Sequence, residues 1–193
     1  PAPIATPEIM AQVQAQVLEP AIAELKRRGI QYCGILYAGL MISPTGKVNV
    51  IEFNCRFGDP ETQAILPLLE TPLHEIMLAC VEGRLSTFGP LKWKSDVSAC
   101  VVAASGGYPG VYKKGLAITG IAEAEAQASL VFNAGTYQKK DALVTDGGRV
   151  LGVGAIAPTF DAAFSKAYTA IESIQFDGIY YRRDIGHRVR SGS

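Results

Sequence analysis

The sequence has no excess of charge of either sign. Its 193 residues carry 18 Lys and Arg against 18 Asp and Glu, which gives a formal net charge of zero at neutral pH. Broad binding to nucleic acid needs a strongly basic surface, so we expect no nucleic-acid partner. A neutral total still permits a locally charged cleft.

The sequence also lacks a long apolar run. A helix that spans a membrane needs about 20 consecutive apolar residues, whereas the apolar stretch at residues 35–42 is strand-length and contains Gly and Tyr. We therefore expect no membrane partner. The opening Pro1-Ala2-Pro3 has neither Met nor a basic residue, so no signal peptide is visible. Such an opening is typical of the interior of a longer protein, and residues 191–193 are expected to form a tail.

Cysteine is scarce and shows no metal-binding spacing. The four cysteines form no C-x-x-C motif, which argues against a zinc ribbon or a thioredoxin-like redox motif. Three of them lie in apolar segments and are expected to be buried free thiols. Free thiols are typical of a reducing compartment, so we expect a cytoplasmic protein.

What the sequence does contain is typical of a globular protein. Hydrophobic residues make up 48% and charged residues 19%, and the length suits one large or two small domains. The stretch 84–96 contains Gly-Pro and shows no periodicity. We therefore predict one domain over residues 1–83, a linker over 84–96 and a second domain over 97–190.

Local patterns predict the elements of the first domain. Thr6 and Pro7 are typical of a helix start, Pro20 is expected to kink or restart the helix, and Gly29 is expected to end it. Residues 32–42 and 48–54 are rich in strand formers and flank a Ser-Pro-Thr-Gly turn, which predicts a β-hairpin. Two short helices are then expected over residues 59–66 and 73–83.

The second domain is predicted to be richer in strands. Short apolar runs separated by Gly-rich turns predict strands over residues 99–104, 130–133, 142–145 and 150–157. Thr159 can cap a final helix. The predicted fold class is α+β, with mostly antiparallel strands and helices on one side.

The most informative pattern lies on the second strand of the hairpin. Side chains alternate between the two faces of a strand, so Glu52 and Asn54 should point one way, and Ile51 and Phe53 the other, into the core. Carboxylate and carboxamide oxygens suit Mg²⁺ or Mn²⁺. If the strand continues, Arg56 keeps the same side and can bind a phosphate or carboxylate.

The same residues also have a plain structural interpretation. Glu52 and Asn54 can form an ordinary solvated strand face. Asp59-Pro60-Glu61 has the composition of a helix start, in which Asp59 is the cap. From spacing alone, both the metal-site and the structural interpretations stay open.

A longer motif resembles a known family. Residues 52–63 read EFNCRFGDPETQ, which is similar to the motif of the phosphoribosylamine–glycine ligases, also called glycinamide ribonucleotide synthetases, in the ATP-grasp superfamily. Residues 34–41, 104–110, 146–151 and 181–186 agree with the family in the same order. The resemblance covers essentially the whole chain but corresponds to the C-terminal half of the family's enzyme.

The resemblance implies a fold, a reaction and a set of site residues. The fold would be the C-terminal half of an ATP-grasp domain followed by a small strand-rich α/β domain. The reaction would join glycine to 5-phosphoribosylamine through a glycyl phosphate, with ATP as cosubstrate and Mg²⁺ or Mn²⁺ as cofactor. Glu52 and Asn54 would be the metal ligands and Arg56 a catalytic residue, and Asp59 would orient the glycine ammonium.

The resemblance also implies that the missing N-terminal half carries the lid and the adenine contacts, so the isolated chain is expected to be inactive. The strand at 32–42 contains no acid, although many ATP-grasp enzymes place another metal ligand there. Three alternatives stay open: another ATP-grasp carboxylate–amine ligase, a non-catalytic structural fragment and a metal-free interaction module. The loop at residues 106–110 lacks the Lys-Ser/Thr of a P-loop and is expected to be a turn, facing the ribosyl substrate.

Overall fold

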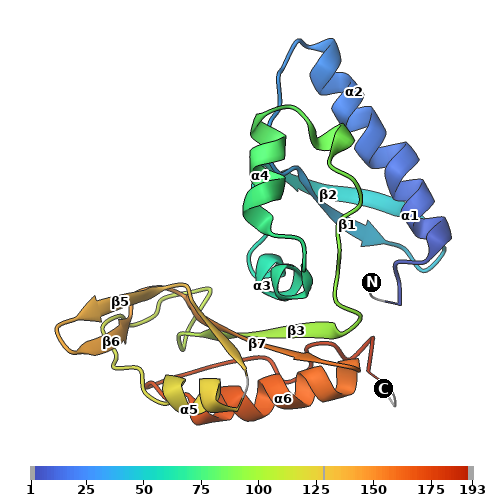
Figure 1. Cartoon of the computed structure of the whole chain (residues 1–193). Helices are drawn as coiled ribbons and strands as arrows, with labels where there is room; N and C mark the ends of the chain where they lie inside the picture. The colour runs from blue at the N-terminus through green and yellow to red at the C-terminus, as the bar shows by residue number, and fades with distance from the viewer. Residues whose placement is uncertain (1–2, 128, 191–193) are drawn as a thin grey trace. The chain divides into compact units, whose positions relative to one another are not determined.

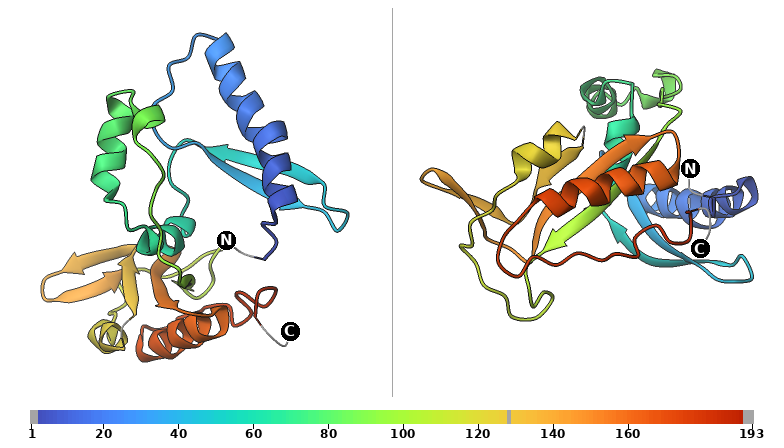
Figure 2. Two further views of the ribbon diagram at one scale, coloured as in Figure 1. Left: turned by 45° about the vertical axis from the view of Figure 1, so that its right-hand side comes forward. Right: turned by 90° about the horizontal axis from the view of Figure 1, so that it is seen from below.

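The structure, a computed structural model, describes residues 3–127 and 129–190. The chain divides into two compact units, whose elements are drawn in Figures 1 and 2. The first unit takes in Pro1–Gly58 and Thr71–Leu91, and the second takes in Asp59–Glu70 and Lys92–Ser193. One crossing between the units falls inside the predicted linker 84–96. Residues 59–70 belong to the second unit, whereas the prediction placed them in a first domain over residues 1–83.

A long helical segment opens the first unit. It comprises α1 (Pro7–Val13), a π-helical stretch η1 (Gln14–Leu18) and α2 (Glu19–Arg27). The predicted cap is confirmed, because the Ile9 backbone N–H donates to Thr6 Oγ1 at 3.3 Å. Pro20 lacks an N–H, and its ring crowds the carbonyl one turn before it. The wider π-helical turn just before Pro20 accommodates the ring without breaking the segment.

The helical segment ends where the sequence predicts. Gly29 has a φ of +69°, a conformation that favours glycine. Two bonds close the end: Gly29 N–H donates to Lys26 O, and Ile30 N–H donates to Leu25 O, each at 3.0 Å.

The predicted hairpin follows. It consists of β1 (Tyr37–Ile42) and β2 (Val48–Asn54), which pair antiparallel. Strand β1 is shorter than predicted, because residues 31–36 form a loop. The small core of this unit comprises Val13 and Val17 from the helical segment and Val48 from β2. Helix α4 (Leu73–Val81) and the short η3 (Leu85–Thr87) complete the unit.

The second unit contains a three-stranded antiparallel sheet in the order β3-β7-β4, formed by β3 (Val97–Ala104), β7 (Arg149–Ala157) and β4 (Leu130–Asn133). A separate hairpin joins β5 (Thr136–Lys139) to β6 (Ala142–Thr145). Neither β5 nor helix α5 (Ile121–Ala126) was predicted from the sequence.

Helices cover both faces of this sheet. Helix α6 (Phe160–Ser173), capped by Thr159 as predicted, packs its buried residues against Val101 and Val153 on one face. On the other face, Gly152 and Gly154 leave room for α3 (Glu61–Ile65), because an added Cβ would lie 3.7–3.8 Å from atoms of Gln63. The short η2 (Leu66–Leu68) continues α3. The prediction of helices on one side is therefore wrong for this unit.

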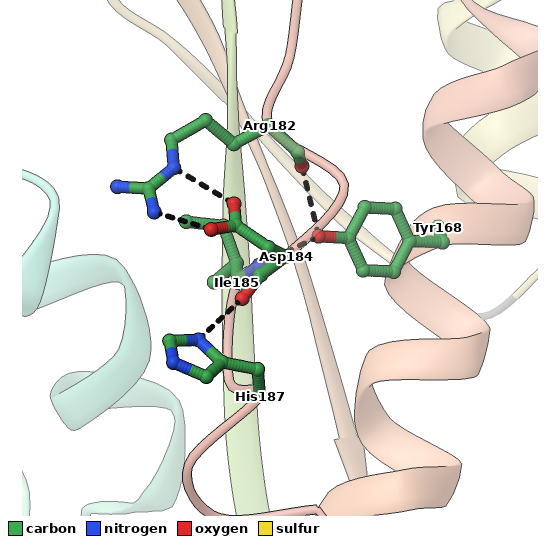
Figure 3. A network of polar contacts seen from close by, with 5 residues as sticks. All are labelled: Tyr168, Arg182, Asp184, Ile185 and His187. Carbon is green, nitrogen blue, oxygen red and sulfur yellow. Dashed lines mark hydrogen bonds and ion pairs between the residues drawn. The ribbon is translucent and has the colours of Figure 1, made fainter. Parts of the chain in front are cut away.

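Residues 181–190 of the second unit form no strand. Figure 3 shows how Tyr168 of α6 secures them: its hydroxyl donates to Arg182 O at 2.8 Å and accepts from Ile185 N–H at 3.1 Å. The Arg182 guanidinium pairs with Asp184 at 2.6 Å, and His187 Nδ1 lies 3.0 Å from Asp184 O.

The predicted α+β class is confirmed. Every strand pair among the described residues is antiparallel, and helices pack on the larger sheet. Over the same residues, no helix combines the length and the apolar composition needed to cross a bilayer.

Candidate active site

A β-bulge interrupts the strand that carries the predicted metal ligands. Gly39 pairs with Glu52 and Leu40 pairs with Val50, so Ile51 has no cross-strand partner. An extra residue of this kind resets the alternation of side chains along the strand and re-aims those that follow. The bulge therefore decides which face Glu52 occupies.

The side chains on either side of the bulge show this effect. Before the bulge, Val48 packs into the core against the helical segment. After it, Phe53 pairs with Ala38, which packs against the same core, so Glu52 and Asn54 project from the opposite face. In an unbroken strand, Val48, Glu52 and Asn54 would all face the helix.

The predicted meeting of Glu52 and Asn54 on one face is confirmed. The Asn54 side chain donates from Nδ2 to Glu52 Oε1 at 2.9 Å. Gly39 on the neighbouring strand leaves space for this arrangement, because an added Cβ would lie 3.2 Å from Glu52 Cγ. The two side chains are therefore close enough to bind one ligand together.

The accompanying prediction that Ile51 and Phe53 are buried is wrong. Ile51 is 63% exposed and Phe53 is 43% exposed. Ile51 is the bulge residue, and Phe53 lies in an open cavity beside Leu25 of α2. Two strands and one helical segment do not supply enough apolar surface to enclose both side chains.

The chemistry of the Glu52–Asn54 pair fits a hard divalent cation. Both side chains offer oxygen ligands, and Mg²⁺ typically takes few protein ligands and completes its shell with water or phosphate oxygens. A half-turn about the Cβ–Cγ bond of Asn54 would exchange its NH₂ for its oxygen beside the carboxylate. The described residues contain no cluster of three or more His, Cys, Asp or Glu side chains that could hold a metal.

Arg56 lies beyond the strand, so the condition under which it would share a face with Glu52 and Asn54 is not met. Strand β2 ends at Asn54, and the Arg56 guanidinium donates from Nη1 to Phe57 O at 2.7 Å. Arg56 and Phe57 line a cavity of about 360 Å³ together with residues of α4. Arg56 is exposed, so its guanidinium can exchange the Phe57 carbonyl for an anionic ligand.

Asp59 belongs to the second unit and does not cap a helix. The N-cap of α3 is Pro60, and no side chain bonds to it there, so the capping interpretation of Asp59 is wrong. The Asp59 carboxylate pairs with Arg149 Nη2 at 3.3 Å and accepts from Gln63 Nε2 at 2.9 Å. Arg149 Nη1 also donates to the Asp59 backbone carbonyl at 2.8 Å. Asp59 therefore links the start of α3 to β7.

The carboxylate also influences a neighbouring thiol. Burial, with a smaller contribution from the charge of Asp59, raises the pKa of Cys100 to about 12. Cys100 is half-buried, and Cys33 and Cys55 are exposed. All four thiols are free, as predicted, but the prediction that three of them are buried is wrong.

Comparison with known protein families identifies both parts of the chain. Residues 1–62 match the family model of the phosphoribosylglycinamide synthetase ATP-grasp (A) domain, and residues 98–188 match that of the phosphoribosylglycinamide synthetase C domain. The two ranges follow one another in the chain and together cover most of it. The chain therefore resembles the phosphoribosylglycinamide synthetases over most of its length.

Individual relatives agree with this assignment. A phosphoribosylamine–glycine ligase of Nostoc sp. is 62% identical over 192 residues, which is 99% of this chain and 45% of the relative. The crystal structure of the phosphoribosylamine–glycine ligase of Thermotoga maritima superposes with a TM-score of 0.80 at 33% identity, covering 94% of this chain and 44% of that one. The chain therefore spans about half the length of the relatives that it matches.

A more distant structure shares the fold alone. The biotin carboxylase domain of the Hydrogenobacter thermophilus 2-oxoglutarate carboxylase has a TM-score of 0.59 at 14% identity, over 94% of this chain and 39% of that one.

The synthetase ATP-grasp model covers the four residues singled out from the sequence: Glu52, Asn54, Arg56 and Asp59. Of these, the structure brings Glu52 and Asn54 together, whereas Asp59 interacts with Arg149 and Gln63. The role of Arg149 was not predicted from the sequence. A single Arg at the start of a strand gives no local indication of a partner 90 residues earlier.

The Gly-rich loop of the synthetase C domain is a turn after β3, as predicted. Ser105 secures it by donating from Oγ to Gly147 O at 2.8 Å. Gly106 of this loop lines a cavity of about 380 Å³ together with Asp177 and Gly178, and Tyr112 and Lys113 are among its walls. The adjacent Lys114 pairs with Asp146 at 3.2 Å.

Proposed function

We propose that the chain is the C-terminal part of a ligase that joins glycine to 5-phosphoribosylamine in de novo purine synthesis. The products are glycinamide ribonucleotide, ADP and phosphate. The observation that carries this proposal is the Glu52–Asn54 pair, 2.9 Å apart within the region that matches the synthetase ATP-grasp model. The names of the relatives supply the substrates.

The reaction has two steps. A glycine carboxylate oxygen attacks the γ-phosphorus of ATP, the bond to ADP breaks, and glycyl phosphate forms. The amine of phosphoribosylamine then attacks the glycyl carbonyl carbon, phosphate leaves, and the amine loses a proton. The first step brings a carboxylate against a polyanion, so charge neutralisation lowers its barrier.

The residues of this chain support the first step by binding and orientation. Glu52, through its carboxylate, and Asn54, through Oδ1, would hold Mg²⁺ or Mn²⁺. When bound, such an ion neutralises charge on the phosphate oxygens. Arg56 would bind an oxygen of the transferring phosphoryl group, because a guanidinium presents several donors to an oxyanion.

Asp59 would orient the ammonium of glycine. Its side chain is 43% exposed, and its carboxylate is held by Arg149 and Gln63. These two partners fix the direction of the carboxylate and leave accessible surface on it for a further donor. We infer a binding role for Asp59 and assign it no proton transfer.

We infer that catalysis requires more than this chain. The chain covers 45% of the Nostoc relative, so the lid and adenine contacts of the family are proposed to come from sequence outside it. The isolated chain is then expected to bind Mg²⁺-ATP weakly and to turn over no substrate. We further propose a cytoplasmic protein whose partners are small molecules, and neither nucleic acid nor membrane.

The other interpretations have less support. Another ATP-grasp ligase is disfavoured by the relatives, since the biotin carboxylase likeness extends to the fold alone. A non-catalytic fragment or a metal-free interaction module gives no reason for the bulge that aims Glu52 and Asn54 away from the core.

The proposal is tested in a protein extended to the length of the relatives. Glu52→Ala should lower ADP formation that depends on glycine and phosphoribosylamine by about 100-fold or more, because a metal-binding carboxylate is lost. Glu75→Ala is the matched control, since Glu75 is exposed on α4. Near-normal turnover of Glu52→Ala would remove Glu52 from the metal site, and activity with another carboxylate but not glycine would overturn the substrate assignment.

A further inference from the structure

Two cysteines from distant parts of the sequence meet in the first unit. Cys33 Sγ lies 3.6 Å from Cys80 Sγ, although the residues are 47 positions apart. The Cys33 thiol also lies 3.4 Å from the Cys80 backbone carbonyl, to which it donates. Cys33 belongs to the loop before β1, and Cys80 lies in the last turn of α4.

The surroundings allow these sulfur atoms to approach further. A disulfide bond is about 2.0 Å long, so closing it requires a movement of roughly 1.6 Å. Cys80 is held by its helix, whereas Cys33 is exposed and lies in a loop without regular structure. Gly34 follows with a φ of +130°, so the loop turns there through a conformation that glycine adopts at low cost.

The pair also lies beside a residue of the candidate active site. Cys33, Cys80 and Arg56 line the same cavity of about 360 Å³. A bond between the two sulfur atoms would fix the loop against α4 and thereby fix one wall of that cavity.

We propose that Cys33 and Cys80 are a redox-sensitive pair that forms a reversible disulfide by exchange with a low-molecular-weight or protein disulfide. One thiolate attacks a sulfur of the oxidant, which releases the first oxidant thiol and leaves a mixed disulfide. The second thiolate attacks the sulfur of its partner cysteine and releases the second oxidant thiol. The pair loses two protons and two electrons, and the oxidant disulfide gains them. A dithiol reductant reverses both steps.

Cys33 and Cys80 are free thiols in the folded chain. The hydrogen bond to Cys80 and partial desolvation raise the pKa of the Cys33 thiol, so Cys33 is protonated in neutral solution. The other two thiols serve as internal controls: Cys55 is exposed, and Cys100 belongs to the second unit. The proposal depends on the first unit alone and holds whether or not the chain contributes to a ligase.

The pairing is tested by treating the folded chain with oxidised glutathione and mapping its disulfides by mass spectrometry. A Cys55→Ser/Cys100→Ser variant keeps the pair and should lose the mass of two hydrogens through a Cys33–Cys80 bond that dithiothreitol reverses. Cys33→Ser should carry a lasting glutathione adduct on Cys80 instead. Adducts that persist on both cysteines of the intact pair, or a Cys33–Cys55 bond as the main product of the wild-type chain, would overturn the proposal.

The effect of the disulfide on the motion of the loop is measured separately by amide hydrogen exchange. Oxidation should slow exchange at residues 33–36 by about tenfold or more, because the crosslink removes the opening motion of that loop. The Cys33→Ser/Cys80→Ser variant should show no such change with the same oxidant. A crosslinked chain whose loop exchanges as fast as before would show that the bond does not fix the cavity wall.

Discussion

The two units of the chain bury their apolar side chains to very different degrees. In the second unit, Leu151 and Ile171 are completely buried in a core shared by β3, β7 and α6. In the first, the core consists of three buried valines, and large side chains such as Ile22, Ile51 and Val81 are 60–75% exposed. The unit that carries Glu52 and Asn54 is therefore the one with less internal support.

This contrast indicates in which unit a substitution should change the stability of the protein. An apolar side chain that is exposed in the folded state contributes little to the free energy of unfolding. A buried one contributes about 1.5–3 kcal/mol. We expect substitutions of similar chemistry to have large effects in the second unit and small effects in the first.

The largest expected difference in stability is between substitutions of two leucines. Leu151→Ala should lower the free energy of unfolding by about 2–5 kcal/mol, because it leaves a cavity in the sheet core. Leu78→Ala, at a side chain that is 52% exposed on α4, should stay within about 0.5 kcal/mol. Urea unfolding followed by circular dichroism measures both, and equal losses would remove the distinction between the units.

The second prediction uses the half-buried thiol of Cys100 in the second unit. Its pKa is about 12 in the folded chain, against a reference value of 9.0. The folded state therefore keeps the Cys100 proton when the unfolded state has lost it, so the stabilising contribution is complete below pH 9 and falls as the pH rises toward 12. Over this range the free energy of unfolding falls by at most about 1.4 kcal/mol per pH unit.

The effect is isolated by measuring urea unfolding of the wild type and of Cys100→Ala between pH 8 and pH 10.5. The two proteins share all other titrating groups. The variant should show a shallower decline of stability with pH. Parallel curves for the two proteins would mean that the Cys100 proton is held no more tightly in the folded chain than in the unfolded one.

Two helix caps offer a matched pair of substitutions with a smaller expected effect on stability. Thr159→Ala removes the hydroxyl that accepts from Ala162 N–H, and Thr6→Ala removes the one that accepts from Ile9 N–H. Each should cost about 1 kcal/mol of helix stability. Helix α6 packs on the core, so the Thr159 change should appear in global unfolding, whereas the Thr6 change should appear as faster amide exchange in α1. The reverse distribution would contradict the contrast between the units.

The smallest effect is expected at Asp59. Its ion pair with Arg149 joins side chains that are 43% and 41% exposed, and such pairs contribute about 1 kcal/mol or less. Asp59→Asn should thus leave stability nearly unchanged while lowering the affinity for glycine in the extended protein. A stability loss well above 1 kcal/mol, with glycine affinity intact, would make Asp59 a structural residue only.

Local signals in the sequence predicted the elements that depend on local physics. Thr6, Gly29 and Thr159 mark helix ends because their effects act within one turn. The hairpin was predicted because its turn and both its strands are contiguous. Helix α5 and strand β5 were not predicted because their residues show no clear apolar period.

Non-local features could not be predicted in the same way. The bulge at Ile51 arises from the pairing of two strands, and simple alternation along β2 gives no sign of it. The family motif placed Glu52 and Asn54 in the candidate site, but their exposure on the face opposite the core follows from the bulge. The partnership of Asp59 with Arg149 likewise depends on α3 packing against the sheet of the second unit.

The most direct test of the account places a paramagnetic cation at the candidate site. Mn²⁺ added in small amounts to the isotope-labelled chain should broaden the NMR signals of Gly39, Glu52 and Asn54 first, and Glu52→Gln should abolish that broadening. If these signals stay sharp while others broaden, or if Glu52→Gln leaves the pattern unchanged, the Glu52–Asn54 pair does not bind the divalent cation.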